Sequence, residues 1–523
     1  MYGIAVFVLL PLFLFLRFIV HPIYLYFSDP KGLRRYPNFS PLARITNIPY
    51  MIESASGERS KRLTALHKKH PVLRVGPNAL SYGDVRAIKD IYGHGTKCLK
   101  DDMYVLQSGT HFHLADVIDK GEHARKRKVL SSAYAIKNLE EWEYKIADKV
   151  QRLVHAFDAR CTAPLPPGGR PDEKELTVDY RRWTNFFTMD AIVDIGLSER
   201  LGCLDRGDDV VASEAVDGKI TMVPYIDAVQ GQLTAQSHLV WAYGWYRALH
   251  RLARWLSPKY RRWIAVGDHF DGIVLHQVRN RMRRYEAGEE KLEDFFQALM
   301  ETKDGVPQML PLGEINAECS IMLNAGSVST AVAINNVLYN LLKHPHCLST
   351  LRTEIDTVAD PDEVVIPYDK LKNLPYLRAC LDESMRIAPP TPFGLPRKTP
   401  PEGTTVFGEY VAGNTSVHMS SYVAHRDEKA FAEPEEFRPE RWLGAAGKEL
   451  QPWFITFSAG ARGCIGRNIS YLEQVVVTAS MVHRYEFALP GEGWEQSKYE
   501  HFNLNPGPLP LKIWRREVEV EES

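Results

Sequence analysis

The residues most suited to chemistry lie together in one short segment near the carboxyl end of the chain. Residues 457–466 read FSAGARGCIG, so that Cys464 stands among closely spaced glycines. Gly460 and Gly466 permit a tight turn and a close approach of the backbone to the sulfur and to a bound group. Backbone N–H groups and the start of a following helix can stabilise a negatively charged sulfur. This combination predicts that Cys464 is a thiolate ligand to a haem iron.

The residues that flank Cys464 fit the same chemistry. Phe457 can cover the thiolate side of a haem ring, and Arg462 is a fixed cation suited to a haem propionate. A buried cysteine in a glycine-rich loop is the alternative, and it does not explain the whole pattern. The other six cysteines are sparse and never spaced as Cys-x-x-Cys, which argues against a zinc site or a disulfide scaffold and favours a reducing compartment: Cys98, Cys161, Cys203, Cys319, Cys347 and Cys380.

This segment resembles the haem-binding loop of the cytochrome P-450 family, which has phenylalanine, glycine, arginine, cysteine and glycine at the same spacings. The resemblance extends over nearly the whole chain. Glu383 and Arg386 in LDESMR match the family's Glu-x-x-Arg pair and share one helix face. Arg441 in FRPERW matches the third member of the same network. The resemblance implies that this network is structural, and we expect no catalytic role for it.

The resemblance also implies a cofactor, haem b, with Cys464 as the axial ligand. His123 and Arg127 in HARKRK match a helix position where the family places a tryptophan and an arginine. Histidine replaces tryptophan here, and both side chains can donate to a propionate. Arg397 in FGLPRKT matches a further propionate partner. For each arginine the alternative is an ordinary solvated charge.

A second motif, AGSVST at residues 325–330, matches the helix that lies over the iron in this family. Ala325 and Gly326 fit the family's small residues, which let the helix kink so that dioxygen has room. The family usually relays protons through an acid and a threonine. Here Val328 replaces the acid and Ser329 replaces the threonine, so we expect Ser329 and Thr330 to carry the relay. This departure puts the usual oxygen-activation route in doubt, but not haem binding.

The amino end of the chain has a different character from the rest. Residues 3–16 are uncharged, and apolar residues continue to residue 27. A cleaved signal peptide is the alternative, but the basic start and small cleavage-site residues that it requires are absent. The basic residues that follow place the body of the protein in the cytosol by the positive-inside rule: Lys31, Arg34, Arg35 and Arg44. We therefore expect a single-pass anchor over residues 1–27, in the endoplasmic reticulum.

The remaining pattern predicts a linker over residues 28–49 and one catalytic domain over residues 50–523. The family fold is mainly α with small β-sheets, in a single large triangular domain. We expect helical structure over 129–157 and 176–387, with one long helix over 313–342, and a further helix over 465–485. Strands are expected on either side of a turn over 72–81, and within 404–412 and 414–424. A surface loop is expected over 163–173.

Two further surfaces suggest partners. Residues 240–263, VWAYGWYRALHRLARWLSPKYRRW, are rich in tryptophan, tyrosine and arginine, as helices that contact membrane lipid often are. The alternative is an ordinary amphipathic helix pair packed on the core. Basic residues near the cysteine side of the haem could bind an acidic reductase: Arg125, Lys126, Lys128 and Arg467. The net charge of −1 argues against nucleic acid as a partner.

The resemblance implies a monooxygenase that receives NADPH electrons through NADPH-cytochrome P-450 reductase. One atom of dioxygen would enter a C–H or C=C bond of a small organic substrate. The segments IKDIYGHGTK and HARKRKVLSSAYA are similar to filamentous-fungal members, many of which tailor secondary metabolites. One alternative, slightly favoured by Val328, is a haem-thiolate isomerase or dehydratase that acts without external electrons. Another is a haem-binding module without turnover.

Overall fold

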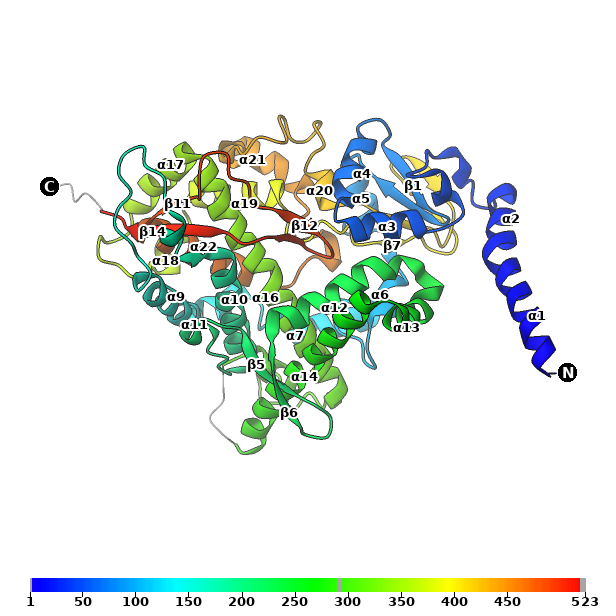
Figure 1. Cartoon of the computed structure of the whole chain (residues 1–523), viewed down its shortest axis with the longest axis horizontal. Coiled ribbons are helices and arrows are strands. Elements are labelled where there is room, and N and C mark those ends of the chain that lie inside the picture. Colours follow the sequence, from blue (N-terminus) through cyan, green and yellow to red (C-terminus); the bar gives the residue numbers. More distant parts are fainter. Residues whose placement is uncertain (1, 289–292, 518–523) are drawn as a thin grey trace.

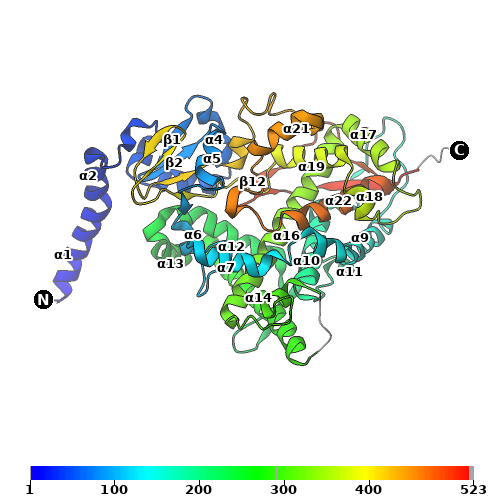
Figure 2. The same ribbon diagram turned by 180° about the vertical axis from the view of Figure 1, so that it is seen from behind.

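In the computed structural model, residues 2–288 and 293–517 are described. They form one mainly helical body of triangular outline, from which a helix at the amino end projects (Figure 1). The view from behind shows the same outline and the same projecting helix (Figure 2). The predicted fold class, mainly α with small β-sheets, is confirmed.

The core of the body is built around one long helix, α16 (Leu312–Lys343). It packs against α10 (Tyr180–Leu197), α19 (Pro375–Ile387) and α22 (Arg467–Arg484). The helix ends at Lys343 because His344 precedes a proline, which disfavours helical dihedral angles, and His344 has φ −129° and ψ 75°. α16 is apolar enough to cross a membrane, but most of it is buried within the protein. The helices predicted over 313–342 and 465–485 are thus present.

The largest sheet has five strands in the order β1-β2-β10-β7-β3. Its members are β1 (Val72–Gly76), β2 (Ala79–Tyr82), β3 (Leu99–Lys100), β7 (Arg397–Lys398) and β10 (Ser416–His418). The predicted strand, turn and strand over 72–81 form the β1–β2 hairpin. At the edge, β3 pairs with β7 so that Lys100 lies opposite Arg397. This register places two cations side by side.

Smaller sheets complete the β structure. The segment 404–412 folds as the hairpin β8 (Thr404–Val406) and β9 (Glu409–Val411), and Phe407 and Gly408 both have positive φ, as a type I′ turn requires. At the carboxyl end, β14 (Pro510–Arg515) pairs with β11 (Tyr485–Ala488) on one side and with β4 (Val178–Asp179) on the other. A separate pair is formed by β12 (Lys498–Glu500) and β13 (Leu504–Pro506).

Three segments differ from their predicted structure. The helix expected over 129–157 is divided among α7 (Lys120–Ser131), α8 (Ile136–Glu141) and α9 (Glu143–Asp158). The backbone of Ala135 is extended, and this interrupts the helix between α7 and α8. The stretch 176–387 includes a hairpin, β5 (Val210–Glu214) with β6 (Ile220–Pro224). Residues Ser421–Ala424 form the short helix α20 instead of a strand, which buries the adjacent Val423 and Ala424 together.

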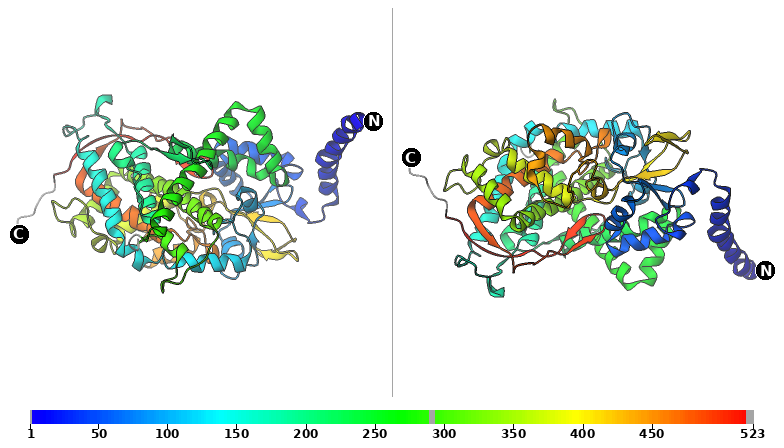
Figure 3. Two further views of the ribbon diagram at one scale, coloured as in Figure 1. Left: turned by 90° about the horizontal axis from the view of Figure 1, so that it is seen from below. Right: turned by 90° about the horizontal axis from the view of Figure 1, so that it is seen from above.

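The amino end forms α1 (Tyr2–Phe15), a π-helical turn (Leu16–Val20) and α2 (His21–Ser28). Residues Val8–Ser28 are 21 residues of mean hydropathy 2.0 with no burial, so they are long and apolar enough to cross a membrane. Views from below and above both show this helix standing away from the body (Figure 3).

The segment expected to be a linker, residues 28–49, packs onto the body. Leu33 and Tyr36 are buried in one hydrophobic cluster, and Phe39 and Ala43 in another. Phe39 N–H also donates to the Arg74 carbonyl at 2.9 Å. The segment therefore holds the base of the apolar helix against the sheet.

Candidate active site

The loop that carries Cys464 is held by its own backbone. The Cys464 N–H donates to the Phe457 carbonyl at 2.8 Å, and Gly463 N–H donates to the Gly460 carbonyl at 3.0 Å. Gly466 directly precedes the first residue of α22, so the sulfur lies near the start of that helix. Phe457 also packs against Tyr471 of α22, with ring centroids 5.2 Å apart.

Two glycines of the loop have separate roles. Gly460 has φ +65°, and a Cβ there would lie 2.2 Å from the Tyr92 carbonyl oxygen of α5 (Ala87–Tyr92). Only glycine fits this position. A Cβ at Gly466 would lie 3.9 Å from the Cys464 Sγ, so the absence of a side chain leaves the space beside the sulfur open.

Cys464 is the only exposed cysteine of the seven, all of which lie among the described residues. Protein atoms nevertheless surround the sulfur, and this burial raises the pKa of the thiol. The Gly466 N–H and the positive charges of Arg127 and Arg467 act in the opposite direction. A group that binds and deprotonates the sulfur has three sources of positive charge to stabilise the thiolate.

Helix α16 brings its AGSVST motif close to the Cys464 loop through α22. The Thr330 Oγ1 donates to the Ser470 Oγ of α22 at 3.0 Å, and both residues are buried. One turn of α16 away from this contact, Ala325 is exposed although most of the helix is buried. The Ser329 hydroxyl donates to the Ala325 carbonyl at 2.8 Å, so these two residues share one face. Thr330 is directed to α22 and not to that face.

The other motif residues face the core. A Cβ at Gly326 would lie 2.6 Å from Ile192, so the glycine allows α10 to pack closely on α16. Val328 is only 6% exposed and belongs to the main hydrophobic cluster. Position 328 is therefore a packing position in this chain, where the family usually has an acid.

The predicted propionate partners form one cluster of buried or half-buried cations. Arg462 donates to the carbonyls of Val117 and Ile118, each at 2.8 Å, and Arg127 donates to the Gly463 carbonyl at 2.8 Å. Arg397 donates to the Tyr104 hydroxyl at 3.1 Å. His123 is 6% exposed on α7, and Lys100, which sequence reasoning missed, is equally buried beside Arg397.

The cations of this cluster repel one another. Burial and then Arg397 lower the pKa of Arg462 to about 10, and burial and then Arg462 lower the pKa of His123 to about 4. The pKa of Lys100 is lowered well below its usual value by burial and then by Arg397 and Arg462. Within the described residues, none of the five forms an ion pair with a carboxylate. A group with two carboxylates, such as a haem, fits this cluster of cations, which we call the cation cradle.

The Glu383 network lies behind the loop, as the sequence predicted. Arg386 binds both carboxylate oxygens of Glu383, at 2.8 and 2.9 Å, and all charged atoms are buried. Arg441 and the Trp442 indole N–H donate to the same carboxylate at 3.1 and 2.8 Å. The expected structural contacts of Glu383, Arg386 and Arg441 are confirmed.

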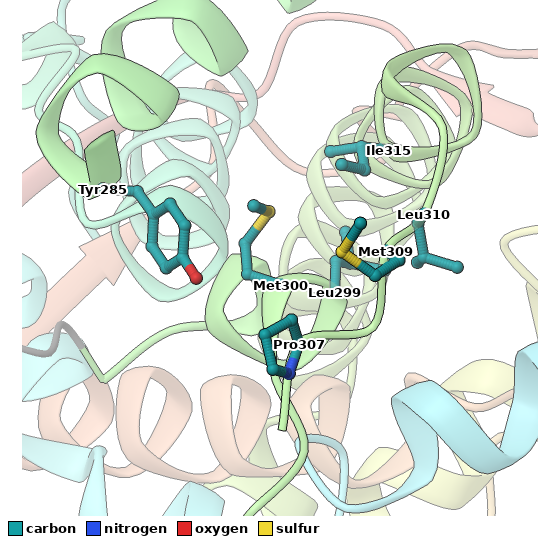
Figure 4. A pocket seen from close by; sticks show the side chains of 7 residues that line it. All are labelled: Tyr285, Leu299, Met300, Pro307, Met309, Leu310 and Ile315. Carbon is teal, nitrogen blue, oxygen red and sulfur yellow. The ribbon is translucent and has the colours of Figure 1, made fainter. Parts of the chain in front are cut away.

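A cavity of about 290 Å³ lies elsewhere, between α14 (Pro258–Glu286) and the start of α16. Figure 4 shows its lining, which is mainly apolar and includes no residue of the Cys464 loop or the cradle. The side chains are Tyr285, Leu299, Met300, Pro307, Met309, Leu310 and Ile315. This cavity is therefore separate from the candidate active site at Cys464.

Comparison with known sequences decides the family. A model of the cytochrome P450 family matches residues 37–513. The chain belongs to the cytochrome P450 family. This P450 is 29% identical over 482 residues to a benzoate 4-monooxygenase, bphA, of Aspergillus niger, which covers 91% of this chain and 92% of the relative.

Two other fungal relatives are similar to the same extent. The cytochrome P450 monooxygenase atr2 of Stereocaulon alpinum is 29% identical and covers 92% of this chain and 91% of its own. The monooxygenase astJ of Aspergillus oryzae is 29% identical with 92% of each chain covered. This P450 is accordingly an oxidoreductase that incorporates oxygen, with a haem-thiolate cofactor. None of these relatives supports the isomerase or dehydratase alternative.

Proposed function

We propose that this P450 inserts one oxygen atom into a small organic substrate as a tailoring step of secondary metabolism, with haem b bound at Cys464. The observation that carries the proposal is the exposed Cys464 beside an unbalanced cation cradle, with the Ala325–Ser329 face of α16 linked to the same helix α22. The fungal relatives support this proposal, because bphA and atr2 are both named as monooxygenases and the name of bphA gives a small molecule, benzoate, as its substrate.

Each residue of the site has a defined task in this proposal. Cys464 ligates the iron, and the Gly466 N–H with Arg127 and Arg467 stabilises the thiolate charge. Arg397 and Arg462, together with Lys100 and Arg127, neutralise the two propionates, and the neutral His123 donates a hydrogen bond to one of them. When bound, the haem supplies the activation of dioxygen by NADPH electrons. Phe457 shields the thiolate side of the ring, and Gly460 fixes the loop against Tyr92.

Proton supply falls to Ser329 in this chain. Its hydroxyl lies on the exposed face of α16 and reaches a neighbouring carbonyl, so it can pass a proton from ordered water. Val328 has no titratable group, and the Thr330 hydroxyl is engaged with Ser470. We therefore assign the relay to Ser329, with Thr330 holding α16 against α22.

We also propose the partners of the enzyme. Residues 1–27 anchor it in the endoplasmic reticulum membrane with the domain in the cytosol. A second lipid contact is provided by α13 (Tyr246–Leu256), whose Leu252, Trp255 and Leu256 are exposed. The ring of Phe18 in the apolar helix contacts Trp245 just before α13, so both surfaces lie on one side of the protein.

NADPH-cytochrome P450 reductase docks on the Cys464 side in this proposal. Lys128 and Arg467 are exposed there. Lys126, expected to contribute, is 4% exposed and lies between the carboxylates of Glu314 and Glu318. The docking charge therefore comes mainly from Lys128 and Arg467.

The function is tested by measuring product formed per NADPH and per dioxygen consumed with the purified enzyme and reductase. The substrate for this assay comes from comparing the metabolites of a host with and without the gene. We expect one oxygen atom from labelled dioxygen in the product. Product formed at full rate without NADPH and reductase would instead show an isomerase or dehydratase.

A further inference from the structure

A second cluster of polar groups, away from Cys464, lies inside a buried aromatic shell. Its centre is Arg59 of α4 (Arg59–His67), which is 1% exposed. The guanidinium carbon of Arg59 lies 4.4 Å from the ring centroid of Phe393, 5.3 Å from that of Trp241 and 5.6 Å from that of Tyr50. His418 of β10 completes the group, with its ring centroid 6.0 Å from that of Trp241. We call these five residues the aromatic box.

Three nitrogen atoms of the aromatic box have no hydrogen-bond partner among the described residues. They are the Nε of Arg59, the Nε1 of Trp241 and the Nδ1 of His418. All three side chains are at least 97% buried, since their exposed fractions are 1%, 3% and 1%. A buried polar atom without a partner loses its hydration, and native proteins rarely leave several of them together.

All three atoms are hydrogen-bond donors. The Arg59 and Trp241 nitrogens carry a hydrogen in every state. The Nε2 of His418 lies 3.0 Å from the Tyr50 hydroxyl. Burial raises the pKa of Tyr50 to about 12, so the hydroxyl keeps its proton. Among the described residues His418 is its one hydrogen-bond partner, so the buried hydroxyl hydrogen is satisfied only when it donates to Nε2. Burial lowers the pKa of His418 to about 3, so the ring is neutral and its single hydrogen is on Nδ1. The box thus requires an acceptor.

The charge of the box decides what kind of acceptor it takes. The Arg59 guanidinium is balanced by the carboxylate of Glu500, at 2.6 Å, and both side chains are buried. With a neutral His418 the box has no net charge. A second carboxylate brought beside Glu500 would be repelled in a medium of low dielectric constant. A neutral oxygen acceptor meets no such repulsion.

The surroundings of the box are suited to a ligand. Tyr104, which accepts a hydrogen bond from Arg397 of the cation cradle, belongs to the same hydrophobic cluster as Trp241 and Phe393. Trp241 lies on a short 3-10 segment (Val240–Trp245) in which Tyr243 has φ +46° and ψ −117°. This backbone conformation is strained for a residue with a side chain, and such strain is often found at ligand-binding segments.

We propose that Arg59, Trp241 and His418 form a subsite that binds a neutral carbonyl oxygen of the substrate, such as a ketone, ester or lactone, at its non-reacting end. The rings of Tyr50, Trp241 and Phe393 pack on one another around the donors, with Trp241 4.8 Å from Tyr50 and 4.9 Å from Phe393 between ring centroids, so the substrate presents its carbonyl end to the box. The subsite deepens the proposed monooxygenase function and rests on it. The donors fix which end of the substrate points away from the iron.

The test uses three matched probes with the full-length, haem-loaded enzyme in detergent micelles. Binding of 2-acetylnaphthalene, 2-ethylnaphthalene and 2-naphthoate is measured by equilibrium dialysis against protein-free micelles. The first two differ only in the carbonyl oxygen. We expect 2-acetylnaphthalene to bind at least about fivefold more tightly than 2-ethylnaphthalene, and 2-naphthoate to bind more weakly than the ketone. Equal binding of ketone and hydrocarbon, or no ketone binding, would mean that the donors serve a structural water only and would overturn the subsite.

Trp241→Phe removes one donor and keeps an aromatic ring. It should weaken binding of 2-acetylnaphthalene about fivefold and leave 2-ethylnaphthalene unchanged. The matched control is Trp183→Phe, a buried tryptophan of α10 that packs on Phe157 and Phe186. Its ratio of ketone to hydrocarbon binding should equal that of the wild type. Equal weakening of both probes by Trp241→Phe would show loss of packing alone and would contradict the proposal.

Glu500→Gln tests the charge argument without changing shape. The box then carries the uncompensated charge of Arg59, so 2-naphthoate should gain at least about fivefold over 2-acetylnaphthalene relative to the wild type. An unchanged preference, or a wild type that already prefers the carboxylate, would overturn the assignment of a neutral acceptor. Because no assay here needs NADPH or turnover, failure of the subsite and failure of the monooxygenase function are seen separately.

Discussion

At the residue scale, the exposure of its side chain distinguishes Cys464 from the other cysteines. Five of the others are buried and Cys161 is half-buried. We predict that Cys464→Ala abolishes the carbon monoxide difference band of a thiolate-ligated ferrous haem, because no other thiol has access to the iron. Cys161→Ala is the control and should keep the band at full height. A Cys464→Ala enzyme that retains the band would disprove the ligand assignment.

Ser329 is the residue on which coupling should depend. We predict that Ser329→Ala lowers product per NADPH roughly tenfold or more and diverts electrons to hydrogen peroxide, because the relay hydroxyl is lost. Ser327→Ala is a matched control, since its hydroxyl makes the same kind of bond to the carbonyl four residues earlier, at 2.7 Å, but on the buried face. Similar peroxide yields from the two variants would exclude Ser329 from the relay.

The effect of a substitution at Val328 could not be predicted from the motif alone. The sequence indicates a missing acid, and suggests that Val328→Asp could restore one. The side chain is packed in the main core, however, so an aspartate there would be buried without a partner at a cost of about 2 kcal/mol or more. Only tertiary packing reveals this, because α10 determines which face of α16 is closed.

At the element scale, the cation cradle depends on the pairing of two very short strands. The sequence predicted Arg397 and Arg462 from their motifs. It could not predict Lys100, because β3 has only two residues and no periodicity marks it. Its position follows from its register opposite Arg397, almost 300 residues away in the chain. The β5–β6 hairpin was missed for a related reason, although the Asp217–Gly218 pair between its strands is a turn signal.

Lys100→Met should have opposite effects on haem retention and on the haem-free protein. Loss of a propionate partner should speed haem transfer to apomyoglobin about tenfold. The haem-free protein should become more resistant to urea, because a buried cation that is repelled by Arg397 and Arg462 is removed. Lys398→Met, on the neighbouring strand β7 but paired with Asp102, is the control. If haem loss and lower resistance to urea occurred together, Lys100 would have a merely structural role.

At the scale of the whole molecule, two apolar surfaces lie on one side of the protein. We predict that a protein lacking residues 1–28 still sediments partly with lipid vesicles, because Leu252, Trp255 and Leu256 on α13 remain exposed. Replacing these three with serine in the truncated protein should release it into the supernatant. A truncated protein that never sediments would leave the apolar helix as the sole lipid contact.

Exposed cations near Cys464 favour docking of the reductase on that side of the molecule. We predict that Lys128→Glu slows reduction by the reductase several-fold at low salt, and less at high salt, because steering charges are screened. Substrate dissociation constants should not change. Lys219→Glu, on the exposed β5–β6 turn, is the matched control. An unaltered reduction rate at low ionic strength would place the docking face elsewhere.

The supports of the Cys464 loop have a consequence for biosynthesis. Gly460 packs on Tyr92, Arg462 binds carbonyls at 117 and 118, and Arg127 binds Gly463, so the loop closes on segments made more than 330 residues earlier. Contacts this distant in sequence form late, after much loop-closure entropy has been lost. Haem capture therefore depends on the last contacts of the fold to form, and a cell short of haem would accumulate protein whose Cys464 loop is still open to degradation.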